Sequence, residues 1–205
     1  MGGERPTQVF IFSGPSGSGK SSVVRHLMKA VPGLCFSVSA TTRAPRGGEQ
    51  EGREYRFVSG EAFERMIAQG EFLEHANVFG HFYGTPRSNL AQARQQGQDL
   101  LLDVDVEGAR QVKARLPAAV AVLLLPPSAQ ELEARLRKRA QDSPAVIQRR
   151  LQRARQEIGS YSSYDYLLVN RDLGETCRQA EAIVVAERAQ RGGPNAGSGP
   201  ARQAQ

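Results

Sequence analysis

Residues 9–21, VFIFSGPSGSGKS, decide the fold class of this 205-residue chain. The first four of these residues are apolar, β-branched or aromatic, and such a short run predicts a buried strand. A glycine-rich turn from Gly14 to Gly19 follows the run. After Ser21, apolar residues recur at helical spacing until Pro32-Gly33 ends the pattern. Strand, glycine loop and helix in this order are typical of proteins that bind nucleotide phosphates.

The loop fits the P-loop pattern G-x-x-x-x-G-K-[ST]. Its glycines let successive backbone N–H groups face phosphate oxygens, and Lys20 is expected to reach the β- and γ-phosphates of a bound nucleotide. Ser21 supplies a hydroxyl for Mg²⁺, so we expect Mg²⁺ as cofactor. The loop alone does not distinguish a GTPase, a motor protein or a small-molecule kinase. The alternative is a glycine-rich turn that binds nothing and matches the pattern by chance. Such a match is disfavoured because Lys, which the pattern requires, is scarce in this chain. The loop residues predicted to bind ATP are Gly14, Pro15, Ser16, Gly17, Ser18, Gly19, Lys20 and Ser21.

Two further apolar runs, residues 100–104 and 119–125, predict buried strands, and a last strand is expected at 166–169 before a helix at 175–190. Continuous apolar strands that alternate with helices are typical of a parallel sheet covered on both faces. The predicted fold class is therefore α/β, with a P-loop NTPase-like parallel sheet core and helices on both of its faces.

Residues 35–60 are polar and rich in Arg, Gly and Thr, with strand-like stretches at 36–39 and 55–58, which predicts a small β-rich insert. Residues 71–86 are mixed in pattern, and a polar helix is expected near 88–96. We predict one domain over residues 1–191. Its expected parts are the core (about 8–34, 88–126 and 160–190), the insert (about 35–87) and a helical lid (about 128–158).

The predicted lid consists of two arginine-rich helices. Ser128 and Glu131 form a capping-box pattern that begins the first helix, and Ser143-Pro144 begins the second. The chain after the last helix, residues 192–205, is composed mainly of Gly, Pro, Ala and Gln. Such a segment has too little apolar surface to order itself, so we expect a disordered tail.

The formal net charge of +6 suits nucleic acid, an anionic membrane or phosphorylated small molecules. Aromatic residues are only 6% of the chain and Trp is absent, which disfavours a nucleic-acid partner. The apolar stretch near the N-terminus is too short to span a bilayer, which disfavours a membrane partner. Cys35 and Cys177 show no metal-ligand or disulfide-framework spacing, so two reduced thiols and a cytoplasmic location are expected.

Residues 37–49, SVSATTRAPRGGE, followed by GREY at 52–55, closely resemble the nucleoside-monophosphate-binding segment of guanylate kinases. The resemblance extends over about residues 8–190, with further matching segments at 74–76, 83–85, 103–108, 139–143 and 164–170. It implies ATP-dependent phosphorylation of GMP to GDP, with dGMP as a second acceptor. ATP and GMP are thus the expected partners, and the oligomeric state stays open.

The resemblance implies that Arg43, Arg46, Tyr55 and Tyr83 hold the phosphate of GMP. Residue chemistry agrees, because Arg presents a planar fork of donors to phosphate oxygens and Tyr adds a neutral donor. The resemblance also implies that Glu74 binds the guanine base of GMP. A carboxylate accepts both the N1–H and the 2-amino group of guanine, whereas adenine presents an acceptor at N1. The implied supporting contacts to GMP are Ser39, Thr85 and Asp105.

Asp103 ends an apolar strand, where a carboxylate orients the metal in P-loop enzymes, so Ser21 and Asp103 are the predicted metal residues. A polar residue that merely ends a strand is the alternative. Arg135, Arg139 and Arg150 match arginines of the family's mobile lid and return helix. Arg135 and Arg139 are assigned to ATP. The residues expected to act in catalysis are Lys20, Arg43, Arg139 and Arg150.

Two other functions fit parts of the pattern. A catalytically silent guanylate-kinase-like module would bind phosphorylated peptides in the acceptor site, and the intact P-loop argues against it. A P-loop kinase for another phosphorylated acceptor would have no use for Glu74 and Thr85. The chain departs from the family pattern at Ala40, where Ser or His is frequent, and at Glu107, where Gln is frequent.

Overall fold

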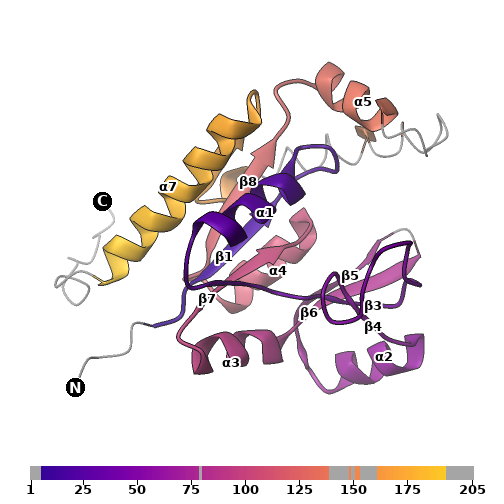
Figure 1. The fold of residues 1–205 in the computed structure, drawn as a ribbon. Coiled ribbons are helices and arrows are strands. Elements are labelled where there is room, and N and C mark those ends of the chain that lie inside the picture. Colours follow the sequence, from indigo (N-terminus) through magenta and orange to yellow (C-terminus); the bar gives the residue numbers. More distant parts are fainter. Residues whose placement is uncertain (1–5, 79, 139–147, 149–150, 153–160, 193–205) are drawn as a thin grey trace, which may run out of the picture.

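The computed structural model describes residues 6–78, 80–138, 148, 151–152 and 161–192, in which strands and helices alternate (Figure 1). The strands are β1 (Val9–Ser13), β2 (Leu34–Phe36), β3 (Ala40–Thr41), β4 (Arg56–Phe57), β5 (Phe72–Val78), β6 (His81–Pro86), β7 (Asp99–Asp103), β8 (Val120–Leu125) and β9 (Tyr166–Val169). The helices are α1 (Lys20–Ala30), α2 (Gly60–Ala68), α3 (Arg87–Gln95), α4 (Val106–Arg115), α5 (Ala129–Lys138) and α7 (Leu173–Gly192), with a 3-10 turn at Tyr161–Ser163.

Five parallel strands in the order β2-β7-β1-β8-β9 form the core sheet. Strand β1 lies at its centre because all five of its residues are buried, so it needs a neighbour on each edge and a cover on each face. Phe10 and Phe12 pack toward α1 and α7, whereas Val9 and Ile11 pack into a second cluster with residues of α3 and α4. The predicted α/β class with a parallel core is confirmed.

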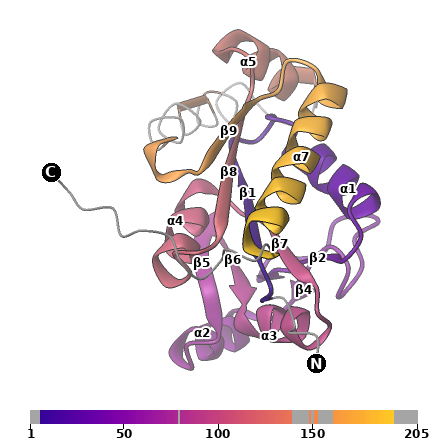
Figure 2. The ribbon, with the colours of Figure 1, turned by 90° about the vertical axis from the view of Figure 1, so that its left-hand side faces the viewer.

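A smaller sheet with the strand order β4-β3-β6-β5 forms, together with α2, a separate layer beside the core (Figures 1 and 2). Its own apolar cluster is centred on Phe63 of α2, which is fully buried. The Phe63 ring stacks on Phe72 at a centroid distance of 4.5 Å and on Phe82 at 5.4 Å. The stacking of these three aromatic rings gives the small insert an apolar core of its own.

The structure differs from the sequence prediction at three places. The strand expected at 36–39 is instead β2, Leu34–Phe36, and it pairs with β7 in the core sheet because Leu34 is buried in the core cluster. Residues 71–86, for which no element was predicted, form the antiparallel hairpin of β5 and β6. Helix α4 was not predicted, since its buried residues include the small Gly108 and Ala109.

Helix α7 joins the end of the described chain to its beginning through a buried ion pair. Arg188 Nε donates to Asp99 Oδ2 at 2.7 Å, and Asp99 is fully buried. The other carboxylate oxygen of Asp99 accepts from the Gln8 backbone N–H at 2.8 Å. A buried carboxylate is tolerated only with such partners, so Arg188 is part of what holds β1 and β7 under α7.

The predicted start of the first lid helix is confirmed, because the Glu131 N–H donates to Ser128 Oγ at 3.1 Å just inside α5. Most of the predicted second lid helix and the tail from 193 to 205 lie outside the described residues. None of the helices in the part of the chain that the structure describes has both the length and the apolar character needed to cross a membrane.

Candidate active site

The P-loop connects β1 to α1 and takes its shape from three glycines with positive φ, Gly14, Gly17 and Gly19. At Gly14 a side chain is excluded twice over. Its φ is +141°, and a Cβ there would lie 2.1 Å from the backbone oxygen of Leu124 in β8. The loop can pass this close to the sheet only without a side chain, and it then delivers Lys20 at the first position of α1.

Lys20 meets the carboxyl end of β7, the strand beside β1. Its Nζ lies 2.9 Å from Asp103 Oδ1 and 2.9 Å from the backbone oxygen of Val104. Both side chains are largely buried, with exposed fractions of 17% for Lys20 and 22% for Asp103. The P-loop lysine and the predicted metal carboxylate are therefore direct neighbours at one end of the parallel sheet, where α/β proteins bind their ligands.

The back of the loop is braced by Asn170, which follows β9. Its Nδ2 donates to the backbone oxygen of Ser18 at 2.7 Å, and a Cβ on Gly19 would lie 2.2 Å from the same nitrogen. The Ser18 side chain is buried, so this predicted ATP-binding residue can reach a phosphate only through its backbone. Sequence reasoning did not single out Asn170 as a residue of the loop.

Helix α5 rests on the front of the loop through apolar contacts. A Cβ on Gly17 would lie 2.9 Å from Leu132 Cδ1 and 3.6 Å from Leu136 Cδ2. Arg135, between these two leucines, donates to the backbone oxygen of Asn170 at 3.3 Å and forms an ion pair with Glu131 at 2.8 Å. Arg139 and Arg150, the other predicted lid arginines, lie outside the described residues.

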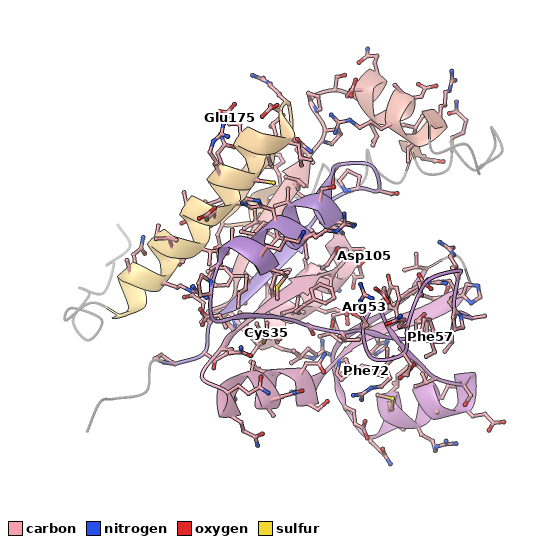
Figure 3. The ribbon with its side chains drawn as sticks, viewed as in Figure 1. Cys35, Arg53, Phe57, Phe72, Asp105 and Glu175 are labelled. Carbon is pink, nitrogen blue, oxygen red and sulfur yellow. The ribbon has the colours of Figure 1, made fainter. Side chains whose placement is uncertain are left out.

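A cleft of about 430 Å³ separates the P-loop from the insert. Asp105 lines this cleft, and Figure 3 shows it between α1 above and the insert below. Walls from both layers make it a site for a ligand that contacts the core and the insert together. The predicted residues that line the cleft are Gly14, Pro15, Ser16, Gly17, Gly19, Lys20, Ser21, Ser39, Arg46, Tyr55, Glu74, Tyr83, Asp103 and Asp105.

Arg43 lies behind the cleft wall and is already bonded. Its Nη2 lies 2.8 and 2.9 Å from the two carboxylate oxygens of Glu49, its Nη1 donates to the Ala44 oxygen at 2.8 Å, and its Nε donates to Tyr83 Oη at 3.1 Å. The guanidinium also lies 5.4 Å from the centre of the Tyr55 ring. Hydrogen bonding from Arg43 holds the pKa of Glu49 below its ordinary value, so this pair is fully charged at neutral pH.

Glu49 is a partner that the sequence prediction missed. Its Oε2 also accepts from the Arg46 N–H at 2.8 Å, so one carboxylate organises the loop that carries both predicted phosphate-binding arginines. Arg46 itself is exposed and lines the cleft. The acidic residue three positions after Arg46 was the available signal, because a turn of this length brings such a carboxylate to the backbone of the arginine.

Glu74 lies on β5 at the floor of the cleft and is only 5% exposed. Its Oε1 accepts from Thr85 Oγ1 at 2.6 Å, and Thr85 is fully buried beneath it, outside the cleft lining. The pKa of Glu74 is raised to about 7, chiefly by burial, with the charge of Asp105 adding to the rise and the hydrogen bond from Thr85 opposing it. Glu74 is therefore poised to be stabilised in its charged form by a ligand that donates hydrogen bonds.

The donor set around Lys20 fits a magnesium ion. Ser21 offers a hydroxyl and Asp103 a carboxylate, both lining the cleft, and Mg²⁺ typically takes one or two such oxygens beside phosphate oxygens and water. Among the described residues, no cluster of three or more His, Cys, Asp or Glu could hold a metal without a ligand's help.

A P-loop facing a buried carboxylate across one cleft is the arrangement of a nucleotide kinase, and residues 6–187 match the family model described as guanylate kinase. The chain belongs to the guanylate kinase family. It is 55% identical over 186 residues to a guanylate kinase of Koribacter versatilis, covering 89% of this chain and 80% of that protein. Identity to a guanylate kinase of Alkalilimnicola ehrlichii is 48%, over 89% of this chain and 90% of the relative.

The guanylate kinase fold is also found in a solved structure. The crystal structure of guanylate kinase from Anaplasma phagocytophilum superposes with a TM-score of 0.71 at 36% sequence identity, covering 90% of this chain and 87% of that one. The predicted family and fold class are confirmed by these matches. The roles of the individual site residues remain predictions, and the predicted residues named above as lining the cleft are the ones that share it.

Proposed function

We propose that this chain is an active guanylate kinase, which transfers the γ-phosphoryl group of ATP to GMP and releases ADP and GDP, with dGMP as a second acceptor. One observation carries the proposal. The Lys20 ammonium of the P-loop and the Glu74 carboxylate of the insert line the same cleft, so a donor phosphate and an acceptor base fit its two sides. The match to the guanylate kinase family supports the same reaction.

On the donor side, the P-loop backbone and Lys20 hold the β- and γ-phosphates. Asp103 keeps the Lys20 ammonium in place at 2.9 Å before the nucleotide binds, so little reorganisation is needed when phosphate charge arrives. Ser21 and Asp103 are the residues that would hold Mg²⁺, which when bound would neutralise charge on the phosphate oxygens. No side chain has to remove a proton, because a phosphate oxygen of GMP is already a competent nucleophile.

On the acceptor side, Arg46, Tyr55 and Tyr83 hold the phosphate of GMP in the line of attack. The three side chains line the same wall of the cleft, which supports this assignment. Arg43 acts from behind that wall. Its hydrogen bond to Tyr83 orients the phenol toward the cleft, and its charge adds to the attraction for phosphate.

The base of GMP meets Glu74, with Ser39 and Asp105 nearby and Thr85 below. Thr85 donates a hydrogen bond to one carboxylate oxygen of Glu74 and so fixes the plane of the carboxylate. Acceptor positions remain for the N1–H and 2-amino donors of guanine. Arg135, Arg139 and Arg150 are proposed to neutralise charge on the transferring phosphoryl group and to exclude water when the lid covers it. Free Cys35 and Cys177 support a cytoplasmic site of action.

Acceptor profiling tests the proposal. Turnover of the purified protein with Mg-ATP is measured for AMP, GMP, CMP and UMP in an ADP-coupled assay, and Lys20→Met serves as the inactive control. We expect GMP to exceed the other acceptors in kcat/KM by about a hundredfold or more. A protein that binds GMP without turnover would instead be a silent binding module, and a preference for another acceptor would refute the guanine assignment.

A further inference from the structure

Strand β5, which carries Glu74, is the edge strand of the insert and meets the core helix α4 along its open side (Figure 2). Gln111 of α4 reaches this edge with both ends of its amide. Its Oε1 accepts from the His75 N–H at 3.2 Å, and its Nε2 donates to the His75 backbone oxygen at 3.0 Å. The side chain thus takes the place that a neighbouring strand would fill.

Arg115, one helical turn further along α4, extends the same contact. Its Nη1 donates to the backbone oxygen of Leu73 at 2.7 Å. Glu74 lies between the two backbone positions that α4 binds, so its place along the edge is fixed from both sides. Arg115 also acts on the carboxylate through space, because its charge lowers the pKa of Glu74.

Helix α4 approaches the Glu74 carboxylate directly at Gly108. A Cβ at this position would lie 2.8 Å from Glu74 Oε2 and 3.2 Å from Glu74 Cδ. The helix can lie this close only with glycine there, which is buried. Three residues on one face of α4, spaced three and four apart, therefore define where the carboxylate lies relative to the core.

We propose that Gln111 is a positioning residue for guanine selectivity, which holds β5 on the core so that the Glu74 carboxylate meets the base edge at the correct distance and angle. This inference rests on the proposed function of Glu74 as the group that reads the base. Hydrogen-bond recognition loses strength within about an ångström of displacement, so a looser β5 weakens selectivity while the P-loop stays intact.

Gln111→Met tests the inference, because it keeps the length of the side chain and removes both hydrogen bonds to His75. The hydrogen bond that Gln111 Nε2 donates to Glu107 Oε1 at 3.2 Å is lost as well. The readout is the ratio of kcat/KM for GMP to that for inosine monophosphate, which lacks the 2-amino group. We expect the ratio to fall about tenfold, with KM for GMP raised and KM for ATP within about twofold of wild type.

Lys113→Met is the matched control on the same helix. Lys113 Nζ donates to Asp165 and to the Ala119 oxygen, away from β5, so its loss affects the anchoring of α4 but not Glu74. We expect a lower melting temperature and an unchanged ratio. Gln111→Glu is a second variant that keeps the acceptor for His75 N–H but turns the donor toward the His75 oxygen and Glu107 into a charged acceptor, so a fall at least as large as that of Gln111→Met is expected of it.

The two Gln111 variants overturn the inference if both fold and both keep the wild-type ratio. Glu74→Gln separates this failure from a failure of the proposed function. If Glu74→Gln lowers the ratio and the Gln111 variants do not, the positioning role alone is wrong. If Glu74→Gln also leaves the ratio unchanged, Glu74 does not read the base, and both the assignment and the inference fall.

Discussion

Replacing Glu74 with Gln gives the sharpest test of the acceptor site, because the variant keeps the size of the side chain and removes its charge. A Gln amide can accept only one of the two hydrogen bonds from guanine, and its NH₂ group faces a donor of the base. We expect kcat/KM for GMP to fall about ten- to a hundredfold at pH 8, which corresponds to roughly 1–3 kcal/mol. KM for ATP should barely change, because Glu74 lies on the insert side of the cleft.

The raised pKa of Glu74 adds a pH dependence that the variant must lose. With a pKa of about 7, the carboxylate of the protein without GMP is roughly nine-tenths ionised at pH 8 and about one-tenth ionised at pH 6. If the ionised form binds guanine, as proposed, kcat/KM for GMP in the wild type should fall about tenfold over this range. The gap between wild type and Glu74→Gln should therefore shrink about tenfold from pH 8 to pH 6.

The assay is kcat/KM for GMP at saturating Mg-ATP from pH 6 to pH 8, for both proteins in parallel. The GMP phosphate has its own second pKa near 6, and it affects both proteins equally, so only the ratio of the two profiles is used. A ratio that stays constant with pH would refute the raised pKa. An equal loss of ATP and GMP kinetics would refute the assignment of Glu74 to the base.

The same pKa makes a prediction about stability without ligand. A carboxyl group whose pKa is raised by folding contributes its stability fully below its unfolded pKa, and that contribution is lost as the pH rises through about 7. Glu74→Gln should therefore increase the free energy of unfolding at pH 8 by up to about 3 kcal/mol and raise the melting temperature there. At pH 5 the melting temperature should change little. A variant less stable than wild type at pH 8 would contradict the burial penalty.

Three further predictions concern the P-loop and the core. Lys20→Ala should lower kcat by two or more orders of magnitude with the fold retained, measured in the coupled assay beside circular dichroism. Gly14→Ala should destabilise the protein and abolish turnover because its Cβ would overlap a carbonyl of β8, whereas the exposed Gly47→Ala, with no atom within 4 Å of its Cβ, should resemble wild type. Arg188→Met should cost about 3 kcal/mol in urea unfolding by removing the guanidinium that pairs with the buried Asp99, with kcat of the folded protein unchanged.

The centre of the core sheet was predictable because β1, β7 and β8 are buried on both faces. Residues such as Phe10, Ile11 and Leu102 are fully buried, so each of these strands appears in the sequence as a run of apolar residues. The P-loop was predictable for a related reason, since positive φ at Gly14 and Gly19 leaves little choice of residue. Both signals are local, whereas β2, which was expected at 36–39 in the insert, pairs with β7 in the core sheet.

The insert and its contacts were less predictable because their determinants are not local. Strand β5 includes a buried Glu74, which breaks the apolar alternation that marks a strand. The pairing of Gln111 with His75 joins residues 36 positions apart, and that of Asn170 with Ser18 joins residues 152 apart. Periodicity predicts which face of an element is apolar, but it does not tell which distant polar group a side chain will meet.

The strand order has a consequence for synthesis of the chain on the ribosome. Strand β1 is made early, yet both of its neighbours, β7 and β8, begin only at Asp99 and Val120. At about 5–20 residues per second, β1 waits roughly 5–20 s for its first partner. The aromatic cluster of the insert is complete by Phe82, well before that. The apolar cluster of the insert can therefore form while β5 still awaits its contacts with α4 and while the P-loop, which emerges first, still awaits the Asn170 brace that is translated 152 residues after Ser18.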